Sequence, residues 1–191
     1  MARDGDSTRD RILGAATAEF AEHGIAGARI ERIAKAARTS KERVYAYFRG
    51  KEQLYRFVAA RELEAMATAV PLDPADLPGY AVRVYDHVVA HPERLRLMQW
   101  GQLEMTAGVG DDPFGLIVEG KIEQLRRAQE AGALDKNWDP ADVIVFVSQL
   151  ATSWAGQVDL VPAGPERHAF LTSRRQAIEK AVRRLFPGAT S

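Results

Sequence analysis

Residues 26–51, AGARIERIAKAARTSKERVYAYFRGK, hold the pattern that decides the fold. Ile30, Ile33 and Ala34 stand at positions i, i+3 and i+4, which share one face of a helix. Residues 37–40, ARTS, interrupt that spacing. The stretch therefore predicts a short helix that ends in a tight turn.

A second short helix follows the turn. Val44 and Phe48 repeat the four-residue spacing, and the hydroxyl of Ser40 can cap the helix by accepting from N–H groups of its first turn. A helix, a turn of three or four residues and a second helix form the layout that places its second helix in the major groove of DNA. The pattern predicts a helix-turn-helix motif.

The same stretch is strongly basic. It carries eight basic residues and two acidic ones, Glu31 and Glu42, which gives a net charge of +6. The whole chain has 26 basic and 26 acidic residues, so the remaining residues carry −6. Phosphate binding needs a local positive field, and a neutral chain can supply one. The alternative is that these charges only solvate the faces of two small helices.

Residues 8–55 resemble the DNA-binding domain of the TetR family of bacterial transcriptional regulators. The positions that match the family in order and spacing are Thr8, Ile12, Ala15, Ala16, Phe20, Gly24, Ile30, Ile33, Ala34, Ala37, Ser40, Val44, Tyr45, Tyr47, Phe48, Lys51, Glu52 and Leu54. The resemblance implies a homodimer that reads a palindromic operator, with a helical C-terminal domain that usually binds a small effector. Downstream of residue 55, only the layout resembles the family.

Composition narrows the remaining classes. The chain has 191 residues, of which 46% are apolar and 27% charged, as is ordinary for a globular protein. It lacks an apolar run long enough for a transmembrane helix, and its first residues, MARDGDSTRD, lack the apolar core of a signal peptide. The absence of cysteine excludes disulfides, thiol nucleophiles and cysteine-ligated zinc. We expect a cytoplasmic protein with no membrane partner and no cofactor.

Nine residues are expected to contact double-stranded DNA. They are Arg29, Thr39, Ser40, Lys41, Glu42, Arg43, Tyr45, Tyr47 and Lys51. Lys41 and Arg43 stand early in the second helix of the motif, where side chains reach base edges, and either can donate to guanine O6 and N7. Arg29, at the start of the first helix of the motif, is expected to contact a phosphate. Thr39 and Ser40 are candidates for a phosphate or a thymine methyl group.

The resemblance places Tyr45, Tyr47 and Lys51 at the family's phosphate-clamping positions. The two tyrosines could instead belong to the core, but Val44 and Phe48 already occupy the buried face, so we expect the tyrosines to face outward.

Two residues replace glycines that are common in the family, Arg38 in the turn and Glu42 in the following helix. Arg38 would be strained if the turn needs a positive φ. The carboxylate of Glu42 repels phosphate and can accept from a cytosine amino group, so we expect it to shape operator choice.

The first helix is expected to run from a capping box at Ser7–Asp10 to His23, after a flexible tail at residues 1–6. Gly24 is placed to end this helix with a positive φ. Ala28 stands where the resemblance predicts a capping threonine, so Gly27 is expected to open the next helix instead.

The fold class expected is all-α, with about nine helices. Residues 1–50 form a three-helix DNA-binding domain, residues 51–68 a connecting helix, and residues 69–191 a helical domain for effector binding and dimerisation.

Two late helices favour an interface with a second copy. The helix that Asp139 and Pro140 open is apolar on most of its circumference, so it needs covering on two sides. The last helix carries a further apolar stripe that includes Leu171, Ile178 and Leu185. Together the two helices predict a four-helix dimer interface, while the alternative is that both complete one monomer core.

An effector pocket is expected in the C-terminal domain, lined by large apolar or singly polar side chains. The candidate lining residues are Tyr85, Met98, Trp100, Gln102, Met105, Phe114, Phe146, Gln149 and Trp154. Ordinary core packing is the competing explanation. The mixture suggests a small hydrophobic and planar effector.

Catalytic and metal sites are not indicated. His87 and His91 have the i, i+4 spacing of a metal pair, but neither a third histidine nor a nearby glutamate completes a metal motif. The sequence shows no nucleophile elbow or phosphate loop. We expect a regulator, a repressor rather than an enzyme, released by its effector. The alternatives are a TetR-like protein without an effector, acting structurally or through a protein partner, and a helical enzyme.

Overall fold

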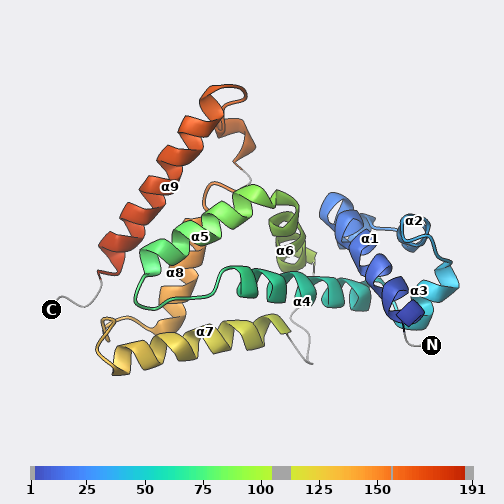
Figure 1. Ribbon diagram of the computed structural model, residues 1–191, viewed down its shortest axis with the longest axis horizontal. Coiled ribbons are helices and arrows are strands. Elements are labelled where there is room, and N and C mark those ends of the chain that lie inside the picture. Colours follow the sequence, from blue (N-terminus) through green and yellow to red (C-terminus); the bar gives the residue numbers. More distant parts are fainter. Residues whose placement is uncertain (1–2, 105–112, 156, 188–191) are drawn as a thin grey trace. The chain divides into compact units, whose positions relative to one another are not determined.

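The computed structural model describes residues 3–104, 113–155 and 157–187, and in these ranges helices joined by turns and loops are the regular structure, without a strand (Figure 1). The helices of these ranges are α1 (Arg3–Gly27), α2 (Ile30–Ala36), α3 (Lys41–Tyr47), α4 (Lys51–Ala69), α5 (Leu77–Ala90), α6 (Pro92–Glu104), α7 (Pro113–Glu130), α8 (Pro140–Thr152), the 3-10 turn η1 (Val158–Leu160) and α9 (Glu166–Leu185). The expected all-α class is confirmed. None of the described helices has the length and apolar character that a membrane span requires.

The chain divides into two compact units. The first joins residues 1–65 with residues 91–112, and the second joins residues 66–90 with residues 113–191. Helix α4 begins in the first unit and ends in the second. Helix α6, which follows residue 90 in the chain, therefore belongs to the unit that contains the helix-turn-helix motif.

The first unit is built around one apolar core to which five helices contribute. Its most deeply buried side chains are Ile12, Phe20, Ile33, Val44, Phe48, Leu54, Val58 and Leu97. The ring of Phe20 meets that of Tyr55 edge to face, with centroids 5.4 Å apart. The Tyr55 hydroxyl donates to the carbonyl of Leu97 at 2.7 Å, and burial raises the pKa of Tyr55 to about 12. This buried contact ties α4 to α6.

Helix α1 begins earlier than the sequence pattern predicts. It starts at Arg3, so the expected flexible tail is wrong for residues 3–6, and the Ser7–Asp10 segment lies inside the helix. Residues 1–2 of the expected tail lie outside the described residues. The sequence of residues 3–6, RDGD, includes two acidic residues, a composition that favours the start of a helix and that the capping-box interpretation overlooked. Gly24 has a φ of 68° and interrupts the helix at the predicted place. The chain becomes helical again after this kink, and α1 ends at Gly27.

The turn between α2 and α3 has the predicted geometry. The hydroxyl of Ser40 accepts from the backbone N–H of Arg43 at 3.2 Å, which confirms the cap of α3. Arg38 has a φ of 53°, and the N–H of Thr39 donates to the carbonyl of Ala34 at 2.9 Å. This hydrogen bond is typical of a helix C-terminus at which the residue after the C-cap, here Arg38, has a left-handed conformation. Glycine is usual at that position. Arg38 therefore carries the backbone strain expected of it.

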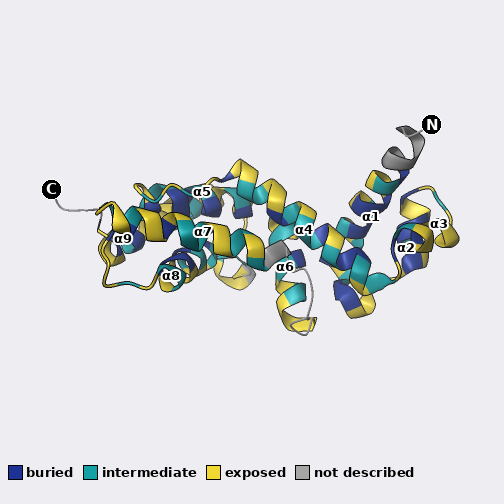
Figure 2. Cartoon of the chain, turned by 90° about the horizontal axis from the view of Figure 1, so that it is seen from below, coloured by how far each residue is buried: buried dark blue, intermediate teal, exposed yellow. Residues whose placement is uncertain are grey.

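In the second unit, α5 packs against α8 and α9, and α7 packs against α8. Asp139 caps α8 by accepting from the N–H of Ala141 at 2.7 Å, and Pro140 occupies the first turn, as predicted. One face of α8 is buried through Val143, Ile144, Val147 and Ala151. The opposite face leaves Val145 and Phe146 exposed by 50% and 41%. Figure 2 shows buried and exposed residues alternating along the helices. One chain therefore covers only one side of this apolar helix.

Candidate nucleic-acid interface

Helix α3 turns its polar side chains outward. Lys41, Glu42 and Arg43 are exposed, whereas Val44 is fully buried against α1 and α2. The turn before the helix adds Ser40, which is exposed, and Thr39, which is half-buried. The apolar spacing thus fixes which face of α3 is free to meet another molecule, and that face carries the predicted base-reading residues.

Lys41 is held by two neighbours. Its ammonium group forms an ion pair with Glu31 of α2, and it lies 5.9 Å from the centroid of the Tyr45 ring. The hydrogen bond to Glu31 raises the pKa of Lys41 and lowers that of Glu31, so both groups are charged at neutral pH. Tyr45 itself is 45% exposed, as predicted.

Arg43 and Tyr47 form a second pair along the helix, with the guanidinium 5.6 Å from the ring centroid. Tyr47 is half-buried and packs against the core of the first unit, so the expectation that it faces outward like Tyr45 holds only in part. The last turn of a short helix lies close to the core, which explains the difference.

Glu42 is exposed at the start of α3. Hydrogen bonds from its own backbone N–H and from Ser40 lower its pKa, so the carboxylate is ionised at neutral pH. A negative charge at this end of the helix is favourable to the helix dipole. On an otherwise basic face, the same charge excludes phosphate from one position.

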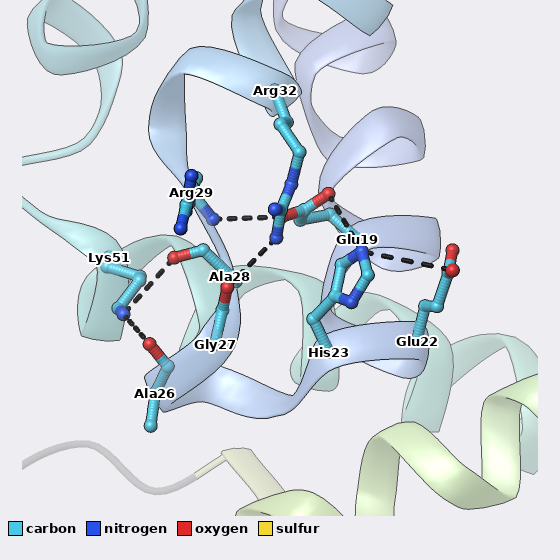
Figure 3. A network of polar contacts seen from close by, with 9 residues as sticks. All are labelled: Glu19, Glu22, His23, Ala26, Gly27, Ala28, Arg29, Arg32 and Lys51. Atoms are coloured by element: carbon cyan, nitrogen blue, oxygen red, sulfur yellow. Dashed lines mark hydrogen bonds and ion pairs between the residues drawn. The ribbon is translucent and has the colours of Figure 1, made fainter.

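The start of α2 depends on a residue that the sequence did not single out, Glu19 of α1 (Figure 3). The N-cap position is Arg29 rather than Gly27, and no capping side chain serves it from within the motif. Instead, Glu19 Oε1 accepts from the backbone N–H of Arg29 at 2.8 Å and from Nε of Arg32 at 2.7 Å. Arg32 also donates to the carbonyl of Gly27 at 2.9 Å. Glu19 thus holds the N-cap residue of α2, whereas a threonine cap would accept from N–H groups of the first turn.

Glu19 is held in its ionised form. Burial raises its pKa, but hydrogen bonds from Arg32 and Arg29 and the charge of Arg32 outweigh that effect, and the pKa lies below the ordinary value of 4.5. Spacing along the chain gives no sign of this role, because Glu19 and Arg29 meet only when α1 and α2 pack together.

Lys51 also joins separate segments (Figure 3). Its ammonium donates to the carbonyl of Ala26 at 2.8 Å and to that of Ala28 at 3.2 Å, which fastens the start of α4 to the linker between α1 and α2. An ammonium group has three donors, so the two carbonyls leave one for a phosphate. Arg29, beside the linker, has an exposed side chain.

The predicted effector-pocket residues are distributed over both units. Trp100 packs on Gly24 in the first unit, where Met98 is half-buried and Gln102 exposed. Met105 and the side chain of Phe114 lie outside the described residues.

In the second unit, Phe146 meets Trp138, and Gln149 is exposed. Tyr85 and Trp154 both adjoin α9. The Tyr85 hydroxyl donates to the carbonyl of Leu171 at 3.1 Å, and the guanidinium of Arg174 lies 4.9 Å from the Trp154 ring. Arg174 also lies 5.0 Å from the ring of Phe170, which meets the Trp154 ring edge to face with centroids 5.4 Å apart.

A small cavity of about 10 Å³ lies elsewhere in the second unit. Its walls are Leu77, Leu134, Asp135, Trp138, Val143, Phe186 and Pro187. It has room for one water molecule, far less than the roughly 300–1,000 Å³ of a ligand site. Among the described residues, no cluster of three or more histidine and acidic side chains could hold a metal ion.

Comparison with known proteins agrees with this geometry. Residues 12–58 match the family described as "Bacterial regulatory proteins, tetR family", and residues 76–184 match "Tetracyclin repressor-like, C-terminal domain". The second match alone spans more than half of the chain. The chain belongs to the TetR family.

Individual relatives are similar over nearly their whole length. The HTH-type transcriptional repressor SCO4008 of Streptomyces coelicolor is 38% identical over 193 residues, which covers 96% of this chain and 97% of the relative. The structure of SCO4942, a candidate transcriptional regulator of the same organism, is 51% identical, has a TM-score of 0.80, and is aligned over 94% of this chain and 98% of its own. The TetR regulator TylP of Streptomyces fradiae has the same fold, with a TM-score of 0.68 at 23% identity, and covers 97% of this chain and 82% of its own.

The chain is therefore a DNA-binding transcriptional repressor with a helix-turn-helix motif. Regulators of this family bind DNA operators, typically as homodimers, and are not enzymes. The prediction of a TetR-type repressor is confirmed, and the alternative of a helical enzyme is excluded.

Proposed function

We propose that two copies of the chain bind one near-palindromic operator, each placing α3 in the major groove, and that a small hydrophobic effector releases them. The observation that carries this proposal is the outward face of α3, on which Lys41 and Arg43 stand together while Val44 anchors the helix. Thr39 and Ser40 precede them, and Glu42 excludes phosphate between them. Arg29, Tyr45, Tyr47 and Lys51 are proposed to hold the flanking phosphates. Such a protein acts where the chromosome is, in the cytoplasm.

The proposed dimer uses α8 and α9. Val145 and Phe146 of α8 and Leu185 of α9 are large apolar side chains exposed by 41–50%, and they belong to the same unit. A palindromic operator needs two reading heads spaced by about one turn of DNA, roughly 34–36 Å. A symmetric dimer formed through these two helices supplies both copies of α3.

The proposed effector acts on the second unit, through α4. Tyr85 meets α9 at Leu171 and Trp154 meets it at Arg174, so a compound that separates them from α9 must displace packed side chains. An effector lowers operator affinity only if it binds one conformation better than the other. The alternative proposal is a repressor without an effector, which acts structurally or through a protein partner. Thermal unfolding with a panel of planar hydrophobic compounds separates the two, because an effector raises the melting temperature.

The experiment that tests DNA reading is a binding-site selection from random duplexes, followed by gel shifts at physiological salt. The wild-type chain should enrich a near-palindrome. Arg43→Ala should relax the preference at one position of each half-site, since a good bidentate base contact is worth about 1–3 kcal/mol. Glu42→Gly should alter the preference at a neighbouring position. If none of these proteins enriches a sequence, the proposed reading face is wrong.

A further inference from the structure

Lys41 differs from the other cation of α3 in having a fixed acidic partner. Among the ion pairs between described residues, α3 takes part through Lys41 alone, and its partner is Glu31 on α2. Both side chains reach solvent, with exposed fractions of 45% for Lys41 and 62% for Glu31. Arg43 instead stacks over Tyr47. Within the described part of the chain, α3 therefore presents one arginine without an ion pair, Arg43, and one lysine that is already paired, Lys41.

Glu31 is placed where it competes with DNA for the ammonium group of Lys41. Glu31 stands in the first turn of α2, and Lys41 in the first turn of α3, so the ion pair joins the N-terminal turns of the two helices of the motif. The ring of Tyr45 supports the same ammonium group from the next turn of α3. A lysine has a long flexible stem and a compact charge, so without such contacts it can reach any phosphate nearby.

We propose that Glu31 is a specificity-determining residue, which keeps the ammonium group of Lys41 away from phosphates and leaves it a donor for a base edge of the operator. This inference rests on the proposed base-reading role of Lys41. Non-specific binding is carried by phosphate contacts, and Glu31 competes with every one of them for this lysine. In the operator complex, the lysine is already aimed along the reading face, and guanine O6 and N7 supply the acceptors.

The effect on affinity is modest and measurable. Exposed ion pairs of this kind change an equilibrium by a factor of roughly 1.4–5. Glu31→Gln should therefore tighten binding to a random-sequence duplex of about 25 base pairs by up to about fivefold. Because Lys41 then neutralises one more phosphate, the slope of log K against log salt should steepen by about 0.9 for that duplex. Operator affinity should rise less, because the ammonium group has three donors and keeps Glu31 while it donates to a guanine, so the ratio of specific to non-specific affinity should fall.

A double-mutant cycle separates this mechanism from simple charge removal. Wild type, Glu31→Gln, Lys41→Gln and the double variant are compared on the selected operator and on the random duplex, from about 50 to 200 mM salt. If Glu31 acts by occupying Lys41, its substitution has no effect in the Lys41→Gln background. If Glu31→Gln tightens random-duplex binding equally with and without Lys41, the carboxylate acts only through the general field and the inference is overturned.

Glu64→Gln is the matched control, because it removes the same charge from an exposed position of α4. It should leave the salt slope for the random duplex unchanged, and a slope as steep as that of Glu31→Gln would overturn the inference. If Lys41→Gln leaves operator preference unchanged, Lys41 does not read bases and the inference fails. The proposed function then still stands or falls on Arg43→Ala, so the two failures are distinguishable.

Discussion

Glu19 of α1 and Arg32 of α2 are joined by a hydrogen bond of 2.7 Å between Oε1 and Nε, and the same carboxylate oxygen accepts from the backbone N–H of Arg29. One side chain of α1 thus holds both the N-cap residue of α2 and the guanidinium of Arg32. The proposed DNA-reading helix, α3, is positioned through α2, since α2 and α3 pack against each other. Glu19 therefore helps to position the outward face of α3 without contacting it.

Glu19→Gln should destabilise the chain by about 1–3 kcal/mol at pH 7, because an amide leaves the charged Arg32 and the N–H of Arg29 less well satisfied. The native pKa of Glu19 is lowered, so its contribution is complete above the unfolded value of about 4.5 and is lost as the pH falls through the native pKa. The difference between wild type and variant should therefore shrink below pH 4.5. Urea unfolding at pH 7 and at pH 3.5 measures it.

Glu22→Gln is the control, since the side chain of Glu22 is 73% exposed, and its substitution should change stability by less than about 0.5 kcal/mol. An equal loss in both variants, or a loss in Glu19→Gln that does not depend on pH, would contradict the role assigned to Glu19.

Gly24→Ala should destabilise the first unit. A Cβ atom at this position would lie 2.5 Å from Oε1 of Glu104 and 3.1 Å from the ring of Trp100, and the positive φ adds strain of about 1–2 kcal/mol. We expect a total loss of roughly 2–3 kcal/mol and a lower melting temperature. Gly14→Ala in the same helix meets open space and should instead stabilise by about 0.5–1 kcal/mol. A neutral Gly24→Ala variant would show that α6 does not hold the end of α1.

Gly24 and its neighbour Trp100 show how much of the fold the sequence predicts. The spacing of Ile30, Ile33 and Val44, the Ser40 cap and the positive φ of Gly24 were all predictable, because each is a local pattern. The close approach of α6 to Gly24 was not, since Trp100 stands 76 residues away in the chain and belongs to a helix that the sequence grouped with the C-terminal domain.

The residues of the candidate site also fall into two groups, those that a local pattern predicts and those that only tertiary packing reveals. The exposed residues of α3 follow from the helical period, whereas the partners Glu31 and Glu19 are polar residues whose contacts span ten positions or more. Exposed polar residues have no periodic signature, so only tertiary packing reveals which of them meet. The resemblance to a family predicts Lys51 as a phosphate contact, and the structure adds two carbonyl acceptors.

Lys51→Met keeps the apolar stem of the side chain and removes its three donors. It should weaken binding to operator and random duplex by the same factor and reduce the salt slope by about one unit, because a phosphate contact carries no sequence information. It should also lower the melting temperature slightly, since two carbonyls of the α1–α2 linker lose their donor. Gel shifts across a salt series and thermal unfolding test the two effects separately. A lower melting temperature with an unchanged salt slope would mean that Lys51 only fastens the linker.

Val145→Glu should separate the proposed dimer. Val145 is half exposed on the face of α8 opposite its buried residues, so a second copy packed there would bury the new carboxylate. Burying an unpaired charge costs roughly 3 kcal/mol or more, which weakens the dimer about a hundredfold, and two-fold symmetry introduces the charge twice. Sedimentation should change from twice the chain mass to the single-chain mass of 21.1 kDa.

Val89→Glu provides the matched control, because Val89 is an exposed valine on α5 of the same unit and receives the same charge. It should remain dimeric. The Val145→Glu monomer should lose far more affinity for the operator than for a random duplex, since one reading head cannot engage both half-sites. If Val145→Glu stays dimeric and Val89→Glu does not, the interface lies on α5, and the apolar outer face of α8 has another purpose.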